Sequence, residues 1–310
     1  MHRASVFPAR NWLPLLAKVV LTRVVLARIA LTRAALLCAV LAAGCASQEG
    51  PRRVGPYPVD THHQAQSQDA RVQFIVLHYT ETGFAESLDI LTRGPVSSHY
   101  LVAANPPRLL RLVPEQRRAW HAGKSQWRGY SALNASSIGI EIVNDGNRGR
   151  REGPFAPWDA AQMEAVVALV RDVAERHGVP PHHIVGHSDI APQRKQDPGP
   201  AFPWQRLVQA GLVPWPDESL VAQAEQRYAT AVPNVAWFQE KLAAHGFEVP
   251  RHGELDAATR NVIACFQMKY RPTRWDGEPD AATAAWLDVA TAPGGLRLFR
   301  EGRWEPYAAP

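Results

Sequence analysis

The first strong hydrophobic signal in the chain is the nearly continuous apolar run Val72–Leu77. Such a run is typical of a strand that is buried on both faces of a central sheet. Shorter apolar segments predict four more strands: His99–Ala103, Leu109–Val113, Ile138–Val143 and Ile184–Val185. From Gly186 to Pro203 the sequence is rich in Pro and polar residues, which predicts a rigid loop.

One helix is predicted clearly, from a cap at Asp159 to about His177. Its apolar stripe consists of Met163, Val166, Val167, Val170 and Val173. Gly178, followed by Pro180 and Pro181, is a strong stop signal. Because strands and helices mix without strict alternation, we expect an α/β fold, with a mixed central β-sheet flanked by helices.

The C-terminal part contains an internal repeat, since the segment Gly253–Thr259 recurs as Gly277–Thr283. Each copy places an Asp where the cap of a following helix should be. With a preceding helix near Val235–His245, the repeat predicts a small three-helix domain. The expected organisation is a leader at 1–44, a tether at 45–70, an α/β domain at 71–212, a linker at 213–230, a helical domain at 231–290 and an irregular tail at 291–310.

The basicity of the chain comes from its first 44 residues. They hold six cations and no acid: Arg3, Arg10, Lys18, Arg23, Arg28 and Arg33. The uncharged run Ala34–Gly44 has the length of a signal-peptide core and is too short to span a bilayer. Without residues 1–44 the formal charge of +5 becomes −1, so the basic pI is no argument for a nucleic-acid partner.

Cys45 follows the small residues of Leu41–Gly44 and resembles the acylated cysteine of a bacterial lipoprotein, although Ala42 stands where Leu is common. We therefore expect cleavage before Cys45 and a lipid anchor there. Ala46 next to it is compatible with transport to the outer membrane. The alternative is an N-terminal membrane helix or an over-long gene start. Since Cys38 leaves with the leader, Cys265 remains the single free thiol, which excludes an intramolecular disulfide and a CxxC zinc site.

Chemically useful side chains gather at strand ends and in the predicted loop. His78 ends the first strand, His187 follows another, and Asp197 comes ten residues later. Two imidazoles and a carboxylate would give zinc three protein ligands and leave the fourth position open, as a hydrolytic site needs. Taken singly, each could equally be a surface residue or a hydrogen-bonded core residue.

Glu141 lies on a predicted strand in which Ile138, Ile140 and Ile142 share the other face. If its own face lines a cleft, the carboxylate could take a proton from an attacking water. Lys195 could bring positive charge to a developing oxyanion. The alternatives are a solvent-facing carboxylate and a solvated lysine.

Five segments together resemble the successive motifs of type-2 N-acetylmuramoyl-L-alanine amidases. They are Val76–Thr80, Ser97–Val102, Ala119–Gly123, Ser137–Glu141 and Gly186–Pro200. The resemblance implies a zinc amidase with the fold of peptidoglycan-recognition proteins. Over nearly the whole chain after Cys45 it extends to outer-membrane amidase lipoproteins with a C-terminal peptidoglycan-binding-like domain.

Carried over by position, the resemblance assigns residues to roles. One Zn2+ per chain is expected on His78, His187 and Asp197, with Glu141 as the catalytic carboxylate and Lys195 on the oxyanion side. Substrate-binding positions are expected at His99, Trp120 and His121, although Trp120 could be a core aromatic. In the helical domain, Phe266–Gln267, Tyr270 and Asp276–Gly277 resemble peptidoglycan-binding modules. The alternative for that domain is one that only packs on the amidase.

The sequence therefore predicts hydrolysis of the amide that joins the lactyl group of N-acetylmuramic acid to L-alanine, in peptidoglycan or in (anhydro)muropeptides. The expected protein is a monomeric lipoprotein of the Gram-negative outer membrane that faces the periplasm and does not bind nucleic acid. Two alternatives stay open: a non-catalytic muropeptide receptor and a cytosolic recycling amidase.

Overall fold

The computed structural model describes residues 53–60, 62–63, 65–147 and 154–308. The predicted leader 1–44 and the predicted lipidation site Cys45 lie outside this range. The chain forms two compact units, 1–68 and 69–310. In the first, the described part of the predicted tether includes a short antiparallel hairpin of exposed residues, β1 (Arg53–Val54) and β2 (Tyr57–Pro58). No helix in the described ranges is both long and apolar enough to cross a bilayer.

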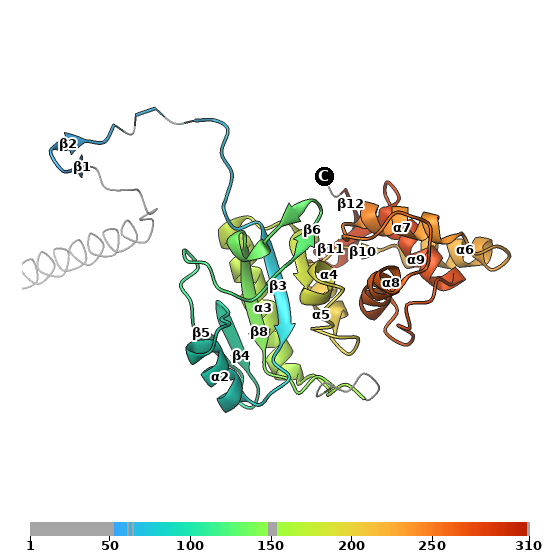
Figure 1. Cartoon of the computed structure of the whole chain (residues 1–310), viewed down its shortest axis with the longest axis horizontal. Coiled ribbons are helices and arrows are strands. Elements are labelled where there is room, and N and C mark those ends of the chain that lie inside the picture. Colours follow the sequence, from blue (N-terminus) through green and yellow to red (C-terminus); the bar gives the residue numbers. More distant parts are fainter. Residues whose placement is uncertain (1–52, 61, 64, 148–153, 309–310) are drawn as a thin grey trace, which may run out of the picture. The chain divides into compact units, whose positions relative to one another are not determined.

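The second unit is built around a five-stranded sheet with the strand order β5-β4-β8-β3-β9 (Figure 1). The strands are β3 (Phe74–Tyr79), β4 (Tyr100–Ala103), β5 (Arg108–Arg111), β8 (Ser137–Ile142) and β9 (Ile184–Gly186). Strands β4, β8, β3 and β9 run parallel to one another, whereas the edge strand β5 is antiparallel to β4. The expected mixed sheet is confirmed, with each predicted strand within two residues of its expected bounds.

The inner strand β3 is buried at all six positions, because parallel neighbours flank it and helices cover the sheet. On β8, Ile138, Ile140 and Ile142 are completely buried on one face. Glu141 lies on the opposite face and pairs in register with His78 of β3. Paired residues of parallel strands project to the same side, so the two functional side chains share one face.

The predicted helix is α3 (Ala160–His177), which contacts β4 and β5. The Asp159 side chain accepts a hydrogen bond from the Gln162 N–H, and Gly178 ends the helix with φ of 66°. Within the predicted α/β domain 71–212, the sequence pattern missed the helices α2 (Phe84–Arg93), α4 (His187–Ile190) and α5 (Trp204–Gln209). The smaller elements are β6 (Gln126–Trp127), β7 (Tyr130–Ser131), η1 (Leu133–Ala135) and η2 (Pro181–His183).

The C-terminal part contains the three expected helices, α7 (Val235–His245), α8 (Ala257–Tyr270) and α9 (Ala281–Thr291). Asp256 and Asp280 cap α8 and α9 by accepting the N–H of Thr259 and Thr283, so the repeat does mark two helix starts.

Two expectations about the flanking segments were wrong. The predicted linker 213–230 contains β10 (Trp215–Pro216) and helix α6 (Glu218–Tyr228), whose Val221 and Ala224 are buried against α9. The predicted irregular tail 291–310 contains the hairpin β11 (Leu296–Arg300) and β12 (Arg303–Tyr307), and β11 pairs with β10. Both segments become regular through packing and pairing with distant parts of the chain, which local pattern does not show.

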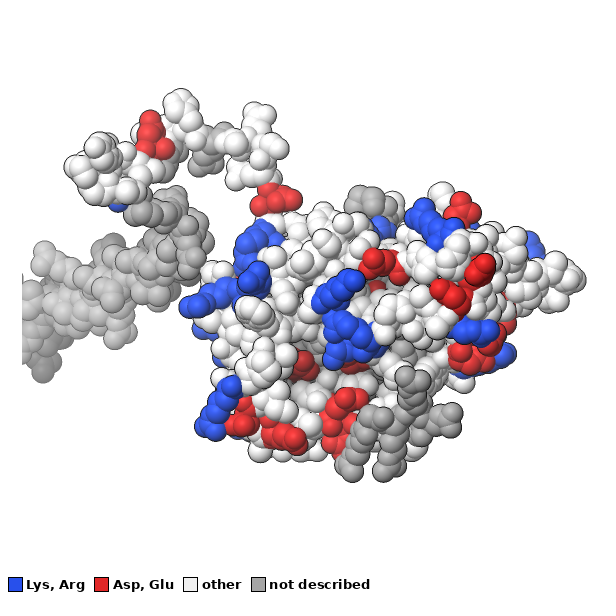
Figure 2. Space-filling view, in the orientation of Figure 1, with Lys and Arg blue, Asp and Glu red and all other residues white. Residues whose placement is uncertain are grey.

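The second unit has an amidase half, which is the predicted α/β domain 71–212, and a C-terminal half, which follows it. One hydrophobic cluster runs through both halves. It includes Ile75 and Leu77 of the sheet as well as Trp215, Phe238 and Phe266 of the C-terminal part. The two halves therefore share one continuous hydrophobic core. On the face shown in Figure 2, basic and acidic side chains of this unit are interspersed.

Candidate metal centre and active site

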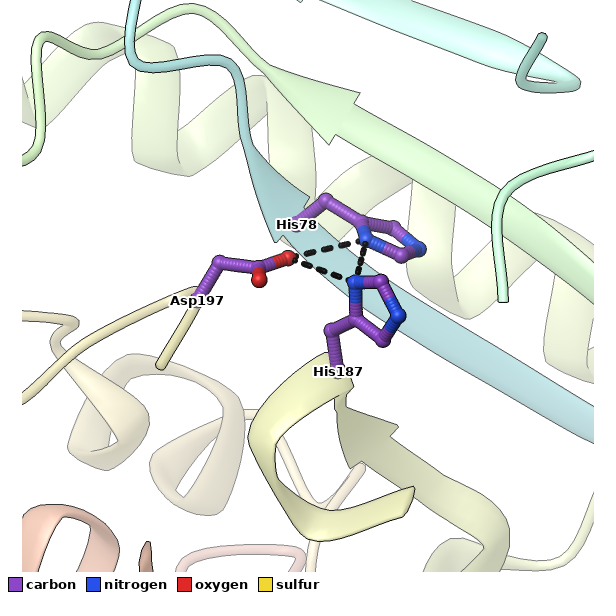
Figure 3. Close-up of side chains that lie close together, drawn as sticks. All are labelled: His78, His187 and Asp197. Carbon is purple, nitrogen blue, oxygen red and sulfur yellow. Dashed lines mark hydrogen bonds and ion pairs between the residues drawn. The ribbon is translucent and has the colours of Figure 1, made fainter. Parts of the chain in front are cut away.

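His78, His187 and Asp197 converge on one point, although they come from three different elements (Figure 3). His78 lies on β3, His187 is the first residue of α4, and Asp197 belongs to the loop that follows. The two Nδ1 atoms are 3.0 Å apart, and Asp197 Oδ2 lies 2.9 Å from Nδ1 of His78 and 3.1 Å from Nδ1 of His187. All three residues are buried.

This donor set fits a metal ion. Ligands at zinc distances on a tetrahedron are about 3.3 Å apart, close to the separations found here. Nε2 of His187 lies 3.3 Å from the Ala122 carbonyl oxygen, to which it can donate. Its Nδ1 lone pair then faces the other two donor atoms, which is the arrangement that partners of ligand histidines impose.

The electrostatics of His78 and Asp197 favour the protonation states that a metal requires. Burial, followed by the neighbouring His187, lowers the pKa of His78 to about 4 against the opposing effect of Asp197. Burial opposes ionisation of Asp197, but the imidazoles of His187 and His78 outweigh it and hold the Asp197 pKa far below its usual range. A neutral imidazole beside an ionised carboxylate is ready to bind a cation without first releasing protons.

His121 extends the hydrogen-bond network on the Nε2 side of His78. Ser137 Oγ donates to the Leu133 carbonyl at 2.6 Å and therefore accepts from Nε2 of His121 at 3.1 Å. Nδ1 of His121 is then the acceptor for Nε2–H of His78 at 3.0 Å, which leaves the Nδ1 lone pair of His78 for the metal. A Cβ on Gly139 would come within 2.4 Å of the His121 ring, so glycine makes room for it.

The three expected substrate-binding positions differ in their placement. His99 is completely buried, and its ring joins the Gly139 N–H at 3.0 Å to the Arg117 carbonyl oxygen at 3.0 Å, so it supports the strand and has no surface for a substrate. Trp120 is 58% exposed at the edge of the cleft, which excludes the core-aromatic alternative. His121 borders the cleft but is 8% exposed.

Glu141 lies beside the cluster of His78, His187 and Asp197, with Oε1 4.0 Å from Nδ1 of His78. Its Oε2 is buried and has no hydrogen-bond partner among the residues that the structure describes. Burial and the negative charge of Asp197 raise the pKa of Glu141 well above its usual range, and Lys195 opposes this shift. Lys195 borders the same cleft. A carboxylate with an unused oxygen and a raised pKa is suited to proton transfer.

A cleft of about 630 Å³ gives access to this cluster. Its lining includes the exposed apolar residues Ile90, Val96 and Trp120. Asn261 and Trp275 of the C-terminal half lie on its border too.

Sequence reasoning missed several residues that shape the centre. Arg194 donates to the carbonyl oxygens of Ala122 and Lys124, and its Nη2 lies 3.3 Å from Nε2 of His187. Ser137 and Gly139 enter the sequence-based prediction only within a motif. The pattern does indicate their position, because small residues alternate with isoleucine on β8 and therefore lie on the same face as Glu141.

The comparisons with known proteins agree with this geometry. The family of N-acetylmuramoyl-L-alanine amidases, Amidase_2, matches residues 68–200, and a peptidoglycan-binding domain family matches residues 232–287. The chain is 45% identical over 253 residues to the N-acetylmuramoyl-L-alanine amidase AmiD of Escherichia coli, covering 79% of this chain and 91% of that protein. It is 32% identical over 165 residues to the 1,6-anhydro-N-acetylmuramyl-L-alanine amidase AmpD of Enterobacter cloacae, covering 47% and 84%.

Two solved structures resemble this chain over most of its length. E. coli AmiD, solved with anhydro-N-acetylmuramic acid-L-Ala-D-γ-Glu-L-Lys, has a TM-score of 0.69 at 43% identity and covers 76% of this chain and 95% of its own. AmpDh3 of Pseudomonas aeruginosa has a TM-score of 0.70 at 36% identity and covers 74% and 95%. The chain belongs to the type-2 N-acetylmuramoyl-L-alanine amidase family and is a hydrolase of that class. Within the family it is AmiD-like, with the helical domain following the amidase domain.

Proposed function

We propose that the chain binds one zinc ion through His78, His187 and Asp197 and hydrolyses the amide between the lactyl group of N-acetylmuramic acid and L-alanine. The observation that carries this proposal is the convergence of three buried donor atoms beside a carboxylate oxygen without a partner. When bound, zinc supplies Lewis acidity at the scissile carbonyl and lowers the pKa of the attacking water.

The side chains of the chain then divide the remaining work. Glu141 takes a proton from the water and delivers it to the leaving nitrogen of L-alanine, so one water is consumed for each amide cleaved. Lys195 stabilises the negative charge that develops on the carbonyl oxygen. His121 and the Ala122 carbonyl keep the two imidazole rings in the tautomer and orientation that ligation needs.

The substrate class follows from the cleft and from the relatives. AmiD and AmpDh3 have been solved with anhydromuramoyl peptides, and we propose that this chain accepts such muropeptides. The open cleft, with the exposed Trp120 at its edge, suits a sugar ring at the rim and a peptide extending outward.

The test is digestion of purified anhydromuropeptide and of intact sacculi by the zinc-loaded protein, followed by mass spectrometry. We expect free stem peptide with an L-alanine amino terminus and a sugar product that carries the lactyl carboxylate. Binding of muropeptide without any cleavage would support the receptor alternative instead. Comparing the two substrates also shows whether intact wall or released fragments are preferred.

We further propose that the protein is an outer-membrane lipoprotein acylated at Cys45. Several acyl chains on one cysteine give a permanent anchor, since each buried CH₂ contributes about 0.8 kcal/mol. Residues 46–70 would then set the reach of the active site from the membrane. Detergent phase partitioning and mass analysis of the mature N-terminus test this, with Cys45→Ser as the control; a soluble wild-type protein with an unmodified Cys45 contradicts it.

A further inference from the structure

Helix α8 of the C-terminal domain lies along the segment 187–197, which carries two of the three metal-binding residues. The residues of α8 that face this segment are Ala258, Asn261, Cys265 and Lys269. Their spacing of three, four and four residues places them on one side of the helix. The Gln193 side chain donates to the Ala258 carbonyl and accepts from the Asn261 amide, both at 3.0 Å. The C-terminal domain therefore supports the catalytic segment directly.

Lys269 makes the deepest of these contacts. Its Nζ lies 3.0 Å from Asp189 Oδ2 and 4.2 Å from the centre of a Trp204 ring. The side chains of Lys269 and Asp189 are 7% and 2% exposed. Because desolvation offsets much of the attraction in such a buried pair, its value lies more in the geometry it imposes than in net stability.

Asp189 links Lys269 to the backbone next to the metal-binding residues. The oxygen that meets Lys269 also accepts the Gly186 N–H at 2.8 Å, directly before His187. One residue further on, the Ser188 N–H donates to the Asp197 carbonyl oxygen at 2.8 Å. A Cβ on Gly186 would lie 2.6 Å from the Pro198 ring, so this turn has no spare room. A shift of Asp189 would move the backbone at both His187 and Asp197.

We propose that Lys269 is a positioning residue for the metal centre, and that the C-terminal domain acts as a scaffold that completes the amidase site. Lys269 neutralises Asp189, and Asp189 holds the start of α4 so that Nδ1 of His187 meets the other donor atoms. This inference rests on the zinc site proposed above. It assigns the helical domain a role in metal binding that is independent of any affinity for the cell wall.

The experiment compares zinc affinity in the full chain and in Lys269→Met, by competition with a chromophoric chelator at a temperature where both are folded. Methionine keeps an unbranched side chain that is one atom shorter, and it removes the charge. We expect the affinity to fall about 10–100-fold, as for other groups that support metal ligands. The visible spectrum of the cobalt-substituted protein should change as well, because the ligand geometry changes.

Lys241→Met is the matched control. Lys241 also pairs with an aspartate, but its partner is Asp288 of helix α9 within the helical domain, at 2.9 Å. We expect its zinc affinity and cobalt spectrum to match the wild type. The double variant Asp189→Asn/Lys269→Met keeps an acceptor for the Gly186 N–H and has no charge to neutralise. We expect it to recover zinc affinity to within about threefold of wild type, and it carries the test if Lys269→Met does not fold.

The outcomes separate the two proposals. A wild-type protein that binds no zinc contradicts the metal site itself. Normal zinc binding by both the wild type and Lys269→Met overturns the positioning role and leaves the site intact. A double variant that binds zinc as weakly as Lys269→Met, or more than tenfold more weakly than wild type where the single variant does not fold, overturns the mechanism through Asp189.

Discussion

Two glutamates of the amidase half, the half-buried Glu141 and the buried Glu115, have opposite surroundings. Oε2 of Glu141 has no hydrogen-bond partner in the described part of the chain, and the pKa of this residue is raised well above its usual range by burial and by Asp197. Glu115 accepts hydrogen bonds at both oxygens, from Arg176, His177 and Tyr100. Burial alone would raise the pKa of Glu115, but these bonds outweigh it and lower the pKa to about 2.

The two glutamates differ in how far their oxygens are hydrogen-bonded, which suits Glu141 to chemistry and Glu115 to support of the fold. A fully satisfied carboxylate stays ionised and holds its neighbours, whereas an under-satisfied one is poised to exchange a proton. The same contrast extends to their partners, since the charge of Glu115 is balanced by Arg176, while the donor atoms beside Glu141 converge on a point where they could hold a metal ion.

The largest effect should come from removing a metal-binding residue beside Glu141. In His187→Ala we expect zinc content and turnover to fall together, the latter by more than about 10³-fold, because several kcal/mol of charge stabilisation are lost. Metal analysis and a muropeptide assay measure both. Removal of zinc by a chelator and its return should abolish and restore wild-type activity; near-normal zinc and turnover in His187→Ala would remove the cluster from the mechanism.

The next largest effect tests the base. In Glu141→Gln we expect zinc and thermal stability to be retained while kcat falls about 10²–10⁴-fold, because the amide keeps the shape but cannot accept the proton. Glu115→Gln is the matched control and should keep kcat within about twofold. Equal losses of kcat in the two variants would erase the distinction between the glutamates.

A smaller effect is expected at His121, where the sequence indicated substrate binding and the structure indicates support of His78. In His121→Ala we expect zinc affinity to fall about 10–100-fold, because the His78 ring loses the acceptor that orients it. Ser137→Ala removes the outer end of the same chain and should give a weaker loss in the same direction. Unchanged zinc affinity with a raised KM would return His121 to a substrate contact.

Much of the fold and of the site could be predicted because side chains alternate between the two faces of a strand, and the sequence shows this alternation directly. The isoleucines of β8 predicted the face of Glu141, and the apolar run of β3 predicted where His78 would emerge. Asp159 and Gly178 marked the ends of α3 through their own cap chemistry.

What could not be predicted depends on contacts between distant residues. Nothing local distinguishes Glu115 from Glu141, since the distinction arises from Arg176 on α3. Lys269 and Asp189 are 80 positions apart, and only the packing of α8 on the amidase half brings them together.

The smallest expected effect concerns Glu115 itself and is one of stability and its dependence on pH. The folded-state pKa of about 2 lies below the ordinary value of 4.5, so the unfolded chain binds the proton more readily. Its contribution to the free energy of unfolding is therefore fully present above about pH 4.5 and is lost as the pH falls toward about 2. We expect this contribution to be about 1–3 kcal/mol at pH 7. It should lie toward the lower value because Arg176 is 42% exposed and water screens the pair.

Glu115→Gln should lose this amount at pH 7, since its amide nitrogen faces the donors of Arg176. Its stability should also vary less with pH between 4.5 and 2. Denaturant unfolding of both proteins at several pH values measures the difference. Parallel curves with a constant gap would mean that Glu115 contributes through packing alone, and the contrast with Glu141 would then rest on hydrogen bonds and not on ionisation.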